Sequence, residues 1–261
     1  MSFWLHITRF VAFCLCVAAP LAIWAAPIDD IQALVDAGQY EQARHLATQM
    51  DTAEGYILAA ESLSAQIMLG EVDKLNKHSK QARELAQMAL HLDPDSYDAK
   101  LQYALADGFV TRTSGNLTAW RKNLPMKTYS SIQDLRQDYP NDARVIALEA
   151  AWHLGVVRKA GEKSGQKWFG ASSLQGRELY NQAIELAPQN IIIRSNYVIG
   201  LLALKHEPDM ADIKSNIEDV LLMTPNNYME TKVQQRMQEI YTNLNNKALC
   251  KKHAEDFLDG Q

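Results

Sequence analysis

Two segments of this sequence combine positive charge with aromatic residues and are the strongest candidates for a binding surface. Residues 107–127 contain four cations against one acid together with a Trp, and residues 155–175 repeat this balance with a Trp and a Phe. Basic charge attracts anionic partners over long distances, and Trp and Arg often anchor interfaces. The predicted partner-binding residues are Trp120, Arg121, Lys122, Arg158, Lys159, Lys163, Lys167, Trp168 and Phe169.

A structural interpretation of the same residues stays open. In that case Trp120, Trp168 and Phe169 pack their rings against helices, and the cations only keep the connecting segments hydrated. The two interpretations differ in how far the aromatic rings are exposed to solvent.

Other patterns that could support catalysis are weak. The stretch from Gly161 to Lys167 lacks the spacing of a phosphate-binding loop, and no strand-like segment precedes it. The chain has no H-E-x-x-H or G-x-S-x-G sequence, and its His residues are scattered. Cys250 precedes Lys251 and Lys252, so it is either a thiol of lowered pKa or an incidental one. We expect no enzyme, no cofactor and no metal site.

The elements that position the two basic segments are expected to be helices ended by proline. Similar phrases surround Pro94, Pro140, Pro188 and Pro225, which are 46, 48 and 37 residues apart. Proline cannot continue a helix because it lacks the N–H group and its ring clashes with the preceding turn. Four such stops at nearly regular intervals predict repeated helical hairpins.

The hairpins resemble those of the tetratricopeptide-repeat family. A Gly turn followed by Tyr and Ala, at Gly38, Tyr40 and Ala43, matches the turn inside that repeat. The second-helix pattern of small residues followed by proline occurs twice, at Ala82, Ala86, Ala89 and Pro94, and at Gly176, Tyr180, Ala183 and Pro188. The resemblance implies an all-α solenoid of about five helix pairs over residues 26–261, with a C-terminal capping helix. It also implies that Ala86, Ala89, Ala183 and Leu186 face the inside of their pairs.

The repeats are longer than the roughly 34 residues of that family. We expect the extra residues within the pairs, at residues 69–80, 107–127 and 155–175. In a stacked hairpin solenoid these connections emerge on one edge, so the two basic segments are predicted to be neighbours. The tail, residues 228–258, is expected to form one or two helices that cap the solenoid.

The first 25 residues are predicted to be a signal peptide. Arg9 precedes an uncharged, mostly apolar stretch that ends at Ala25 and Ala26, where cleavage after Ala25 fits the small residues. An uncleaved membrane anchor is the alternative. Cleavage would remove Arg9, Cys14 and Cys16. The formal charge of −5 then becomes −6, which does not favour nucleic-acid binding, and Cys250 is left without a partner for an internal disulfide.

Together these features predict an exported, periplasmic or secreted scaffold without catalytic activity. Such a protein binds a protein or peptide partner, preferably an acidic one, along its concave face or its basic edge. The alternative is a membrane-anchored or membrane-surface component of an envelope or transport assembly, which contacts anionic lipid.

Overall fold

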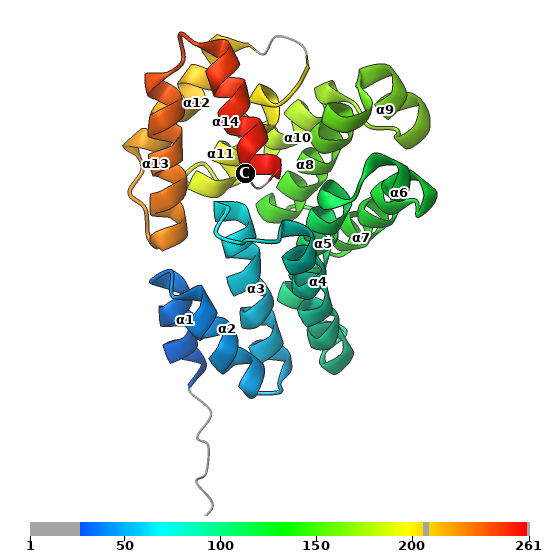
Figure 1. Cartoon of the computed structure of the whole chain (residues 1–261), viewed down its shortest axis with the longest axis vertical. Helices are drawn as coiled ribbons and strands as arrows, with labels where there is room; N and C mark the ends of the chain where they lie inside the picture. Colours follow the sequence, from blue (N-terminus) through cyan, green and yellow to red (C-terminus); the bar gives the residue numbers. More distant parts are fainter. Residues whose placement is uncertain (1–26, 206–208, 260–261) are drawn as a thin grey trace, which may run out of the picture.

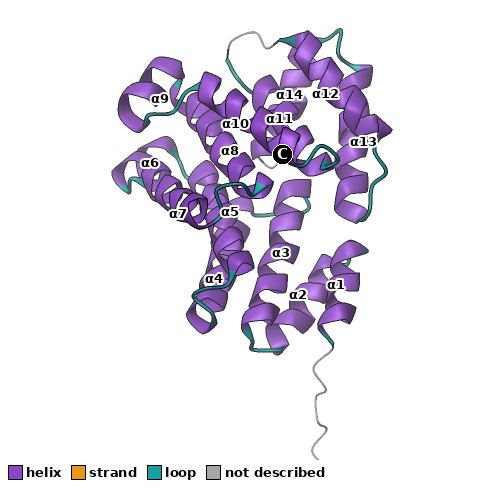
Figure 2. Cartoon of the chain, turned by 180° about the vertical axis from the view of Figure 1, so that it is seen from behind, coloured by secondary structure: helices purple, strands orange, loops and turns teal. Residues whose placement is uncertain are grey.

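The computed structural model of this chain describes residues 27–205 and 209–259, and these residues form an all-α helical-hairpin solenoid (Figures 1 and 2). Fourteen helices account for the described part, which contains no strand. The fold class expected from the sequence is confirmed. The signal peptide and its cleavage site, predicted at residues 1–25, lie outside the described residues.

Successive helices form hairpin pairs. The second helix of each pair packs against the first helix of the next pair. Two pairs contain an additional short helix between their two long helices. The helix α6 lies between α5 and α7, and the helix α9 lies between α8 and α10. The bounds are α1 (Ile28–Asp36), α2 (Tyr40–Gln49), α3 (Ala53–Leu69), α4 (Leu75–Leu92), α5 (Tyr97–Thr113), α6 (Asn116–Arg121), α7 (Leu124–Asp138), α8 (Ala143–Ala160), α9 (Glu162–Phe169), α10 (Ser173–Leu186), α11 (Ile191–Leu202), α12 (Met210–Leu222), α13 (Tyr228–Thr242) and α14 (Lys247–Asp259).

Each of the four proline phrases separates two pairs and also starts the next one. The prolines follow the ends of α4, α7, α10 and α12. Two residues after each proline stands a side chain that accepts a hydrogen bond from a backbone N–H in the first turn of the next helix: Ser96, Asp142, Asn190 and Asn227. These caps satisfy N–H groups that a helix start leaves unpaired. One short phrase therefore ends one hairpin and begins another.

The inside of the pairs is built from small residues, as the repeat resemblance implied. Ala86, Ala89 and Ala183 are fully buried. Leu186 was expected beside them, but that expectation is wrong because its side chain is 48% exposed. The buried stripe of α10 continues from Ala183 to the half-buried Ala187, so Leu186 lies to the side of the stripe in the last turn.

The extra length of the repeats lies mostly in helices, which corrects the expectation of long connections. The predicted connection at residues 69–80 is only a short loop, because α3 extends to Leu69 and α4 begins at Leu75. At residues 107–127 and 155–175, α5 and α8 each run beyond the expected turn and are followed by α6 and α9. Lengthened helices need fewer irregular residues than long loops, whose backbone polar groups would need other partners.

The solenoid curls until its two ends meet. In Figure 1 the C-terminal helices return towards the N-terminal ones, and α13 and α14 both contact α3. Arg236 on α13 donates from Nη2 to the carbonyl oxygen of Leu69 at 3.2 Å. The tail predicted as a cap is thus a further pair of helices that closes the curl. No helix among the described residues is long and apolar enough to cross a membrane.

Candidate functional site

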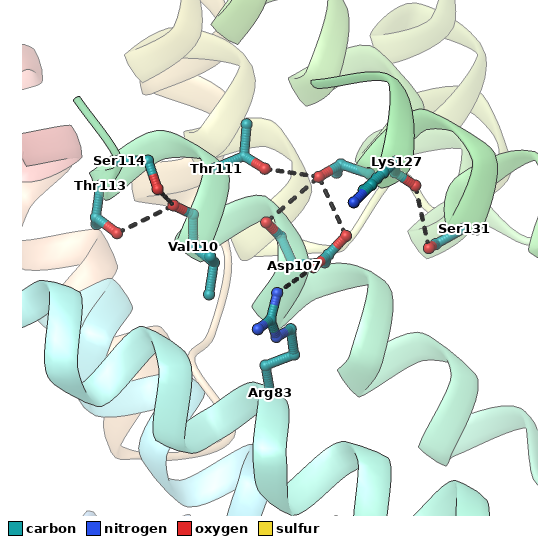
Figure 3. A network of polar contacts seen from close by, with 9 residues as sticks. Arg83, Asp107, Val110, Thr111, Thr113, Ser114, Lys127 and Ser131 are labelled. Atoms are coloured by element: carbon teal, nitrogen blue, oxygen red, sulfur yellow. Dashed lines mark hydrogen bonds and ion pairs between the residues drawn. The ribbon is translucent and has the colours of Figure 1, made fainter. Parts of the chain in front are cut away.

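The site is built at the ends of α5 and α8, which pack against each other and carry α6 and α9 just beyond them. A buried polar network fixes the first of these ends (Figure 3). Asp107, in the middle of α5, accepts from Arg83 Nη1 at 3.2 Å and from Thr128 Oγ1 at 3.3 Å. Thr128 also lies 2.8 Å from the hydroxyl of Thr111. The network joins α4, α5 and α7, so α6 is held between two anchored helices.

Asp107 also affects the charge that this region presents to solvent. It is the single acid of the basic segment 107–127, and it is buried and paired with Arg83. A paired, buried carboxylate does little to neutralise cations at the surface. The exposed part of the segment therefore keeps three cations, Arg121, Lys122 and Lys127, and no acid.

A different set of contacts fixes α9. His153 on α8 accepts at Nδ1 from the backbone N–H of Ser172 at 3.2 Å. The carboxylate of Glu162, in the first turn of α9, accepts from the N–H of Ser173 at 3.0 Å. The chain enters and leaves the helix through Gly161 and Gly170, whose φ angles of +81° and +72° suit residues without a Cβ. The acid of the second basic segment is thus also used internally.

The two Trp residues of the predicted site are displayed to solvent. Trp120 on α6 is 67% exposed and Trp168 on α9 is 66% exposed, and Lys167 Nζ lies 4.9 Å from the centre of the Trp168 ring. Arg121, Lys122 and Lys163 are exposed as well. Across the described residues, no carboxylate forms an ion pair with the four cations. We call Trp120, Arg121, Lys122, Lys163, Lys167 and Trp168 the basic edge.

Three predicted site residues serve the fold instead. Arg158 and Lys159 both bind Asp259 in α14: Arg158 makes two hydrogen bonds of 3.1 and 2.8 Å, and Lys159 one of 3.4 Å. Phe169 is half-buried and packs against the core. These contacts join α8 to α14 and α9 to the core, and Lys159 stays exposed beside Asp259.

Both inserted helices reach the same hollow of the concave face. A cavity of about 650 Å³ is lined by residues of α5, α8 and α11, and also by Trp120 from α6 and Phe169 from α9. The solenoid geometry predicted that the two basic segments are neighbours. Their shared contribution to the cavity lining agrees with this prediction. The last turn of α14 contributes Phe257 and Leu258 to the same cavity. The C-terminal helix therefore occupies part of the face on which a peptide was expected.

Sequence reasoning missed Arg112, which counts as one more cation of the first segment in the sequence. The structure places it in the last turn of α5, against Phe109 and in the lining of the cavity. Arg112 follows Gly108 by four residues and Leu105 by seven, so it lies on the same inner face of α5. This spacing is the sequence pattern that could have placed Arg112 there. This spacing becomes visible only once α5 is known to extend to Thr113.

Cys250 is fully buried, and its Sγ donates to the carbonyl oxygen of Asn243 at 3.1 Å. Burial raises the pKa of this thiol, so the alternative of a reactive cysteine activated by Lys251 and Lys252 is wrong. Residues 27–205 and 209–259 contain no cluster of His, Cys, Asp or Glu that could hold a metal ion.

Comparison with protein-family models and with characterised proteins finds no match to this chain. The surfaces described above are accordingly the basis for inferring the function of this protein.

Proposed function

We propose that this protein is an exported, non-catalytic adaptor of the tetratricopeptide type, which binds an acidic segment of a partner protein at the basic edge. One observation carries the proposal: two Trp side chains, each about two-thirds exposed, stand among four cations that have no carboxylate partner in the described chain. Exposed Trp residues cost free energy in water, and Trp and Arg dominate the energetics of interfaces. An acidic partner would match the charge and cover the rings.

The tetratricopeptide assignment is supported by local features of the hairpins. Gly38 turns the chain between α1 and α2 with a φ angle of +77°, and Ala43, one turn into α2, is fully buried. The same small-residue packing recurs at Ala86 and Ala183. Members of that family present surfaces for protein binding, and a binding edge on this chain is consistent with that role.

The basic edge is favoured over the concave face as the protein-binding surface. An extended peptide in the concave face would have to share that space with the last turn of α14. Displacing α14 would break the contacts of Asp259 with Arg158 and Lys159. The basic edge requires no such rearrangement, because its side chains already point into solvent.

The test is a capture experiment with matched charge reversals. One variant carries Lys122→Glu, Lys163→Glu and Lys167→Glu, and the control carries Lys205→Glu, Lys214→Glu and Lys252→Glu, all at exposed positions. Immobilised protein is incubated with the envelope fraction of its own cells, and the captured proteins are identified by mass spectrometry. We expect the wild type and the control to capture the same acidic partner, with capture weakening as salt rises. Capture of that partner by the basic-edge variant would contradict the proposal.

A membrane surface is the second candidate, and a specific observation favours it. Leu117 on α6 and Leu174 at the start of α10 are exposed near the two Trp residues. Apolar and aromatic tips among cations are typical of segments that lie in the headgroup region of anionic bilayers. Co-sedimentation with vesicles of phosphatidylglycerol, compared with phosphatidylcholine, separates this function from protein binding. Loss of vesicle binding in the basic-edge variant, with no acidic protein captured by the wild type, would favour the membrane.

A further inference from the structure

The guanidinium of Arg112 is a buried charge whose hydrogen-bonding capacity is only partly used. Its Nε and Nη2 atoms are buried, and no residue in the described part of the chain accepts a hydrogen bond from them. The Phe109 ring lies 5.1 Å from Cζ. Burial and the charge of Arg158 lower the pKa of Arg112 to about 10, so the group still carries its proton at neutral pH.

The two unused donors belong to one edge of the guanidinium. The N–H bonds of Nε and Nη2 run nearly parallel along this edge, and such a fork matches the two oxygens of a carboxylate. The neighbouring Arg158 already has such a partner, because Asp259 accepts from its Nη1 and Nη2. Arg112 therefore offers a second fork, and although the charge of Asp259 acts on it, no carboxylate of the described chain accepts from its Nε and Nη2 atoms.

The cavity continues from Arg112 along one face of α5. Leu101, Leu105, Gly108 and Arg112 all line it, at the spacing of a single helix face. At 1.5 Å per residue these positions span about 16 Å. Gly108 lacks a side chain, and nothing lies within 4 Å of where its Cβ would be, which leaves room beside the stripe. The volume of about 650 Å³ is typical of sites for small molecules.

The acidic residues of the lining lie at the end of the cavity away from Arg112, where Arg144 is the accompanying cation. Asp36 and Glu61 line the cavity, and Glu61 lies near Asp98 at the N-terminal end of α5, away from Arg112. A negatively charged headgroup is repelled from this end and attracted to the other. A ligand with one acid group and an apolar body is thus given a single orientation.

We propose that the cavity binds a small amphiphilic carboxylate, whose headgroup pairs with the Nε and Nη2 edge of Arg112 and whose apolar chain lies along α5. The edge is covered by surrounding protein in the ligand-free form, so binding requires a local movement. We expect the side chains of Phe257 and Leu258, which line the cavity, to move while Asp259 keeps its contacts with Arg158 and Lys159. This site shares only Trp120 with the basic edge and does not depend on the function of that edge.

The first test compares ligands on the unmodified protein by isothermal titration calorimetry and thermal unfolding. Decanoate combines the acid and the chain, acetate has only the acid, and decylammonium has the same chain with the opposite charge. We expect decanoate to bind at least tenfold more tightly than decylammonium and to raise the melting temperature, and acetate to do neither. Equal affinity for decanoate and decylammonium would overturn the proposal, since the charge of Arg112 would then play no part.

The second test compares two arginines of the cavity lining. Arg112→Gln removes the charged fork and should weaken decanoate binding at least tenfold. Arg112→Lys keeps a charge without the fork, so its affinity for decanoate should lie between those of the wild type and Arg112→Gln. Arg144→Gln is the matched control, because Arg144 also lines the cavity but is exposed and stacks over Tyr97 at 5.0 Å. Unchanged affinity in a folded Arg112→Gln variant would overturn the assignment. If that variant does not fold, the ligand comparison on the unmodified protein decides.

A third measurement separates this inference from the proposed function. The variant with Lys122→Glu, Lys163→Glu and Lys167→Glu should bind decanoate with the affinity of the wild type, because these residues do not line the cavity. A matching loss of decanoate affinity in this variant would show that the ligand binds at the surface and would overturn the cavity site.

Discussion

The ring of Tyr228, at the start of α13, lies directly against Gly38, in the turn between α1 and α2, and a Cβ at residue 38 would overlap it. The Tyr228 hydroxyl also donates to Glu71 Oε1 at 3.1 Å, and its ring packs edge-on against Tyr40 at 6.1 Å. These contacts join the first hairpin to the last. The concave face becomes a partly enclosed cavity because the solenoid closes in this way.

Gly38→Ala tests this closure against Gly70→Ala. Both glycines have a left-handed backbone, with φ angles of +77° and +74°, but nothing lies within 4 Å of a Cβ at Gly70. Gly70→Ala should therefore cost only the backbone term, about 1–2 kcal/mol. Gly38→Ala should cost about 1–3 kcal/mol more, because the new methyl group overlaps the Tyr228 ring. The measurement is the free energy of unfolding in urea.

A double variant shows whether the extra cost comes from the ring. Tyr228→Ala removes the overlapping group, so adding Gly38→Ala to it should cost no more than Gly70→Ala does. Equal destabilisation by Gly38→Ala and Gly70→Ala in the wild-type background would mean that Tyr228 does not close the solenoid in solution.

Ala183→Leu should destabilise the protein by about 1–3 kcal/mol through overpacking. Ala183 is fully buried inside its helix pair, where a larger side chain has no free volume. Leu186→Ala, three residues later on the same helix, is the control and should change stability by less than about 0.5 kcal/mol because Leu186 is half-exposed. Urea midpoints that coincide for wild type and Ala183→Leu would refute this packing.

The features that could be predicted from the sequence are those encoded within a few residues. A proline with a capping side chain two residues later marks four of the five boundaries between helix pairs in the described chain, as at Pro140 and Asp142. Gly38 likewise indicates a turn, and the buried alanines indicate that two helices pack closely. Both features depend only on the types of these residues. Composition also singled out the two basic segments, which were expected as connections and contain α6 and α9 in the structure.

The features that could not be predicted join residues far apart in the chain. Asp259 binds Arg158 across 101 positions, and neither residue carries a local signal of the pairing. The pairing changes the interpretation of the site, since it removes Arg158 and Lys159 from the free cations. Arg112 was assigned to a loop because the helix was expected to end earlier, and only the full length of α5 places it in the cavity.

Asp259→Asn should destabilise the protein by about 1 kcal/mol at neutral pH, as it breaks a two-point contact between α14 and α8. The Arg158 guanidinium holds the pKa of Asp259 below its usual value. The stabilisation is therefore present above the unfolded-state pKa and is lost as the pH falls through the lower folded-state pKa. The difference in unfolding free energy between wild type and variant should vanish in strong acid.

The control for that pair is Asp256→Asn on the same helix. Asp256 pairs with the exposed Lys252 at 3.1 Å, four residues away, and such surface pairs contribute little. We expect a change of less than about 0.5 kcal/mol. If Asp259→Asn proves as mild as this control, the contact with Arg158 does not hold α14 in place.

His153 should make the stability of the protein sensitive to mild acid. Burial lowers the pKa of this imidazole, and the nearby Glu149 only partly opposes the effect. The folded state therefore binds a proton less readily than the unfolded state, so stability is highest above the unfolded-state pKa, about 6.5, and falls as the pH drops below it. Protonation would also remove the Nδ1 acceptor that holds the N–H of Ser172, and with it the support of α9.

His153→Gln tests this coupling, because its side-chain oxygen can still accept from Ser172 while carrying no titratable group. Between pH 7 and pH 5 the unfolding free energy of the wild type should fall more steeply than that of the variant, by up to about 1.4 kcal/mol per pH unit. Fluorescence provides a local readout, because the ring of Trp152 lies 5.0 Å from that of His153 and should respond to protonation in the wild type before global unfolding. Parallel pH profiles for the two proteins would show that His153 is not the group that titrates.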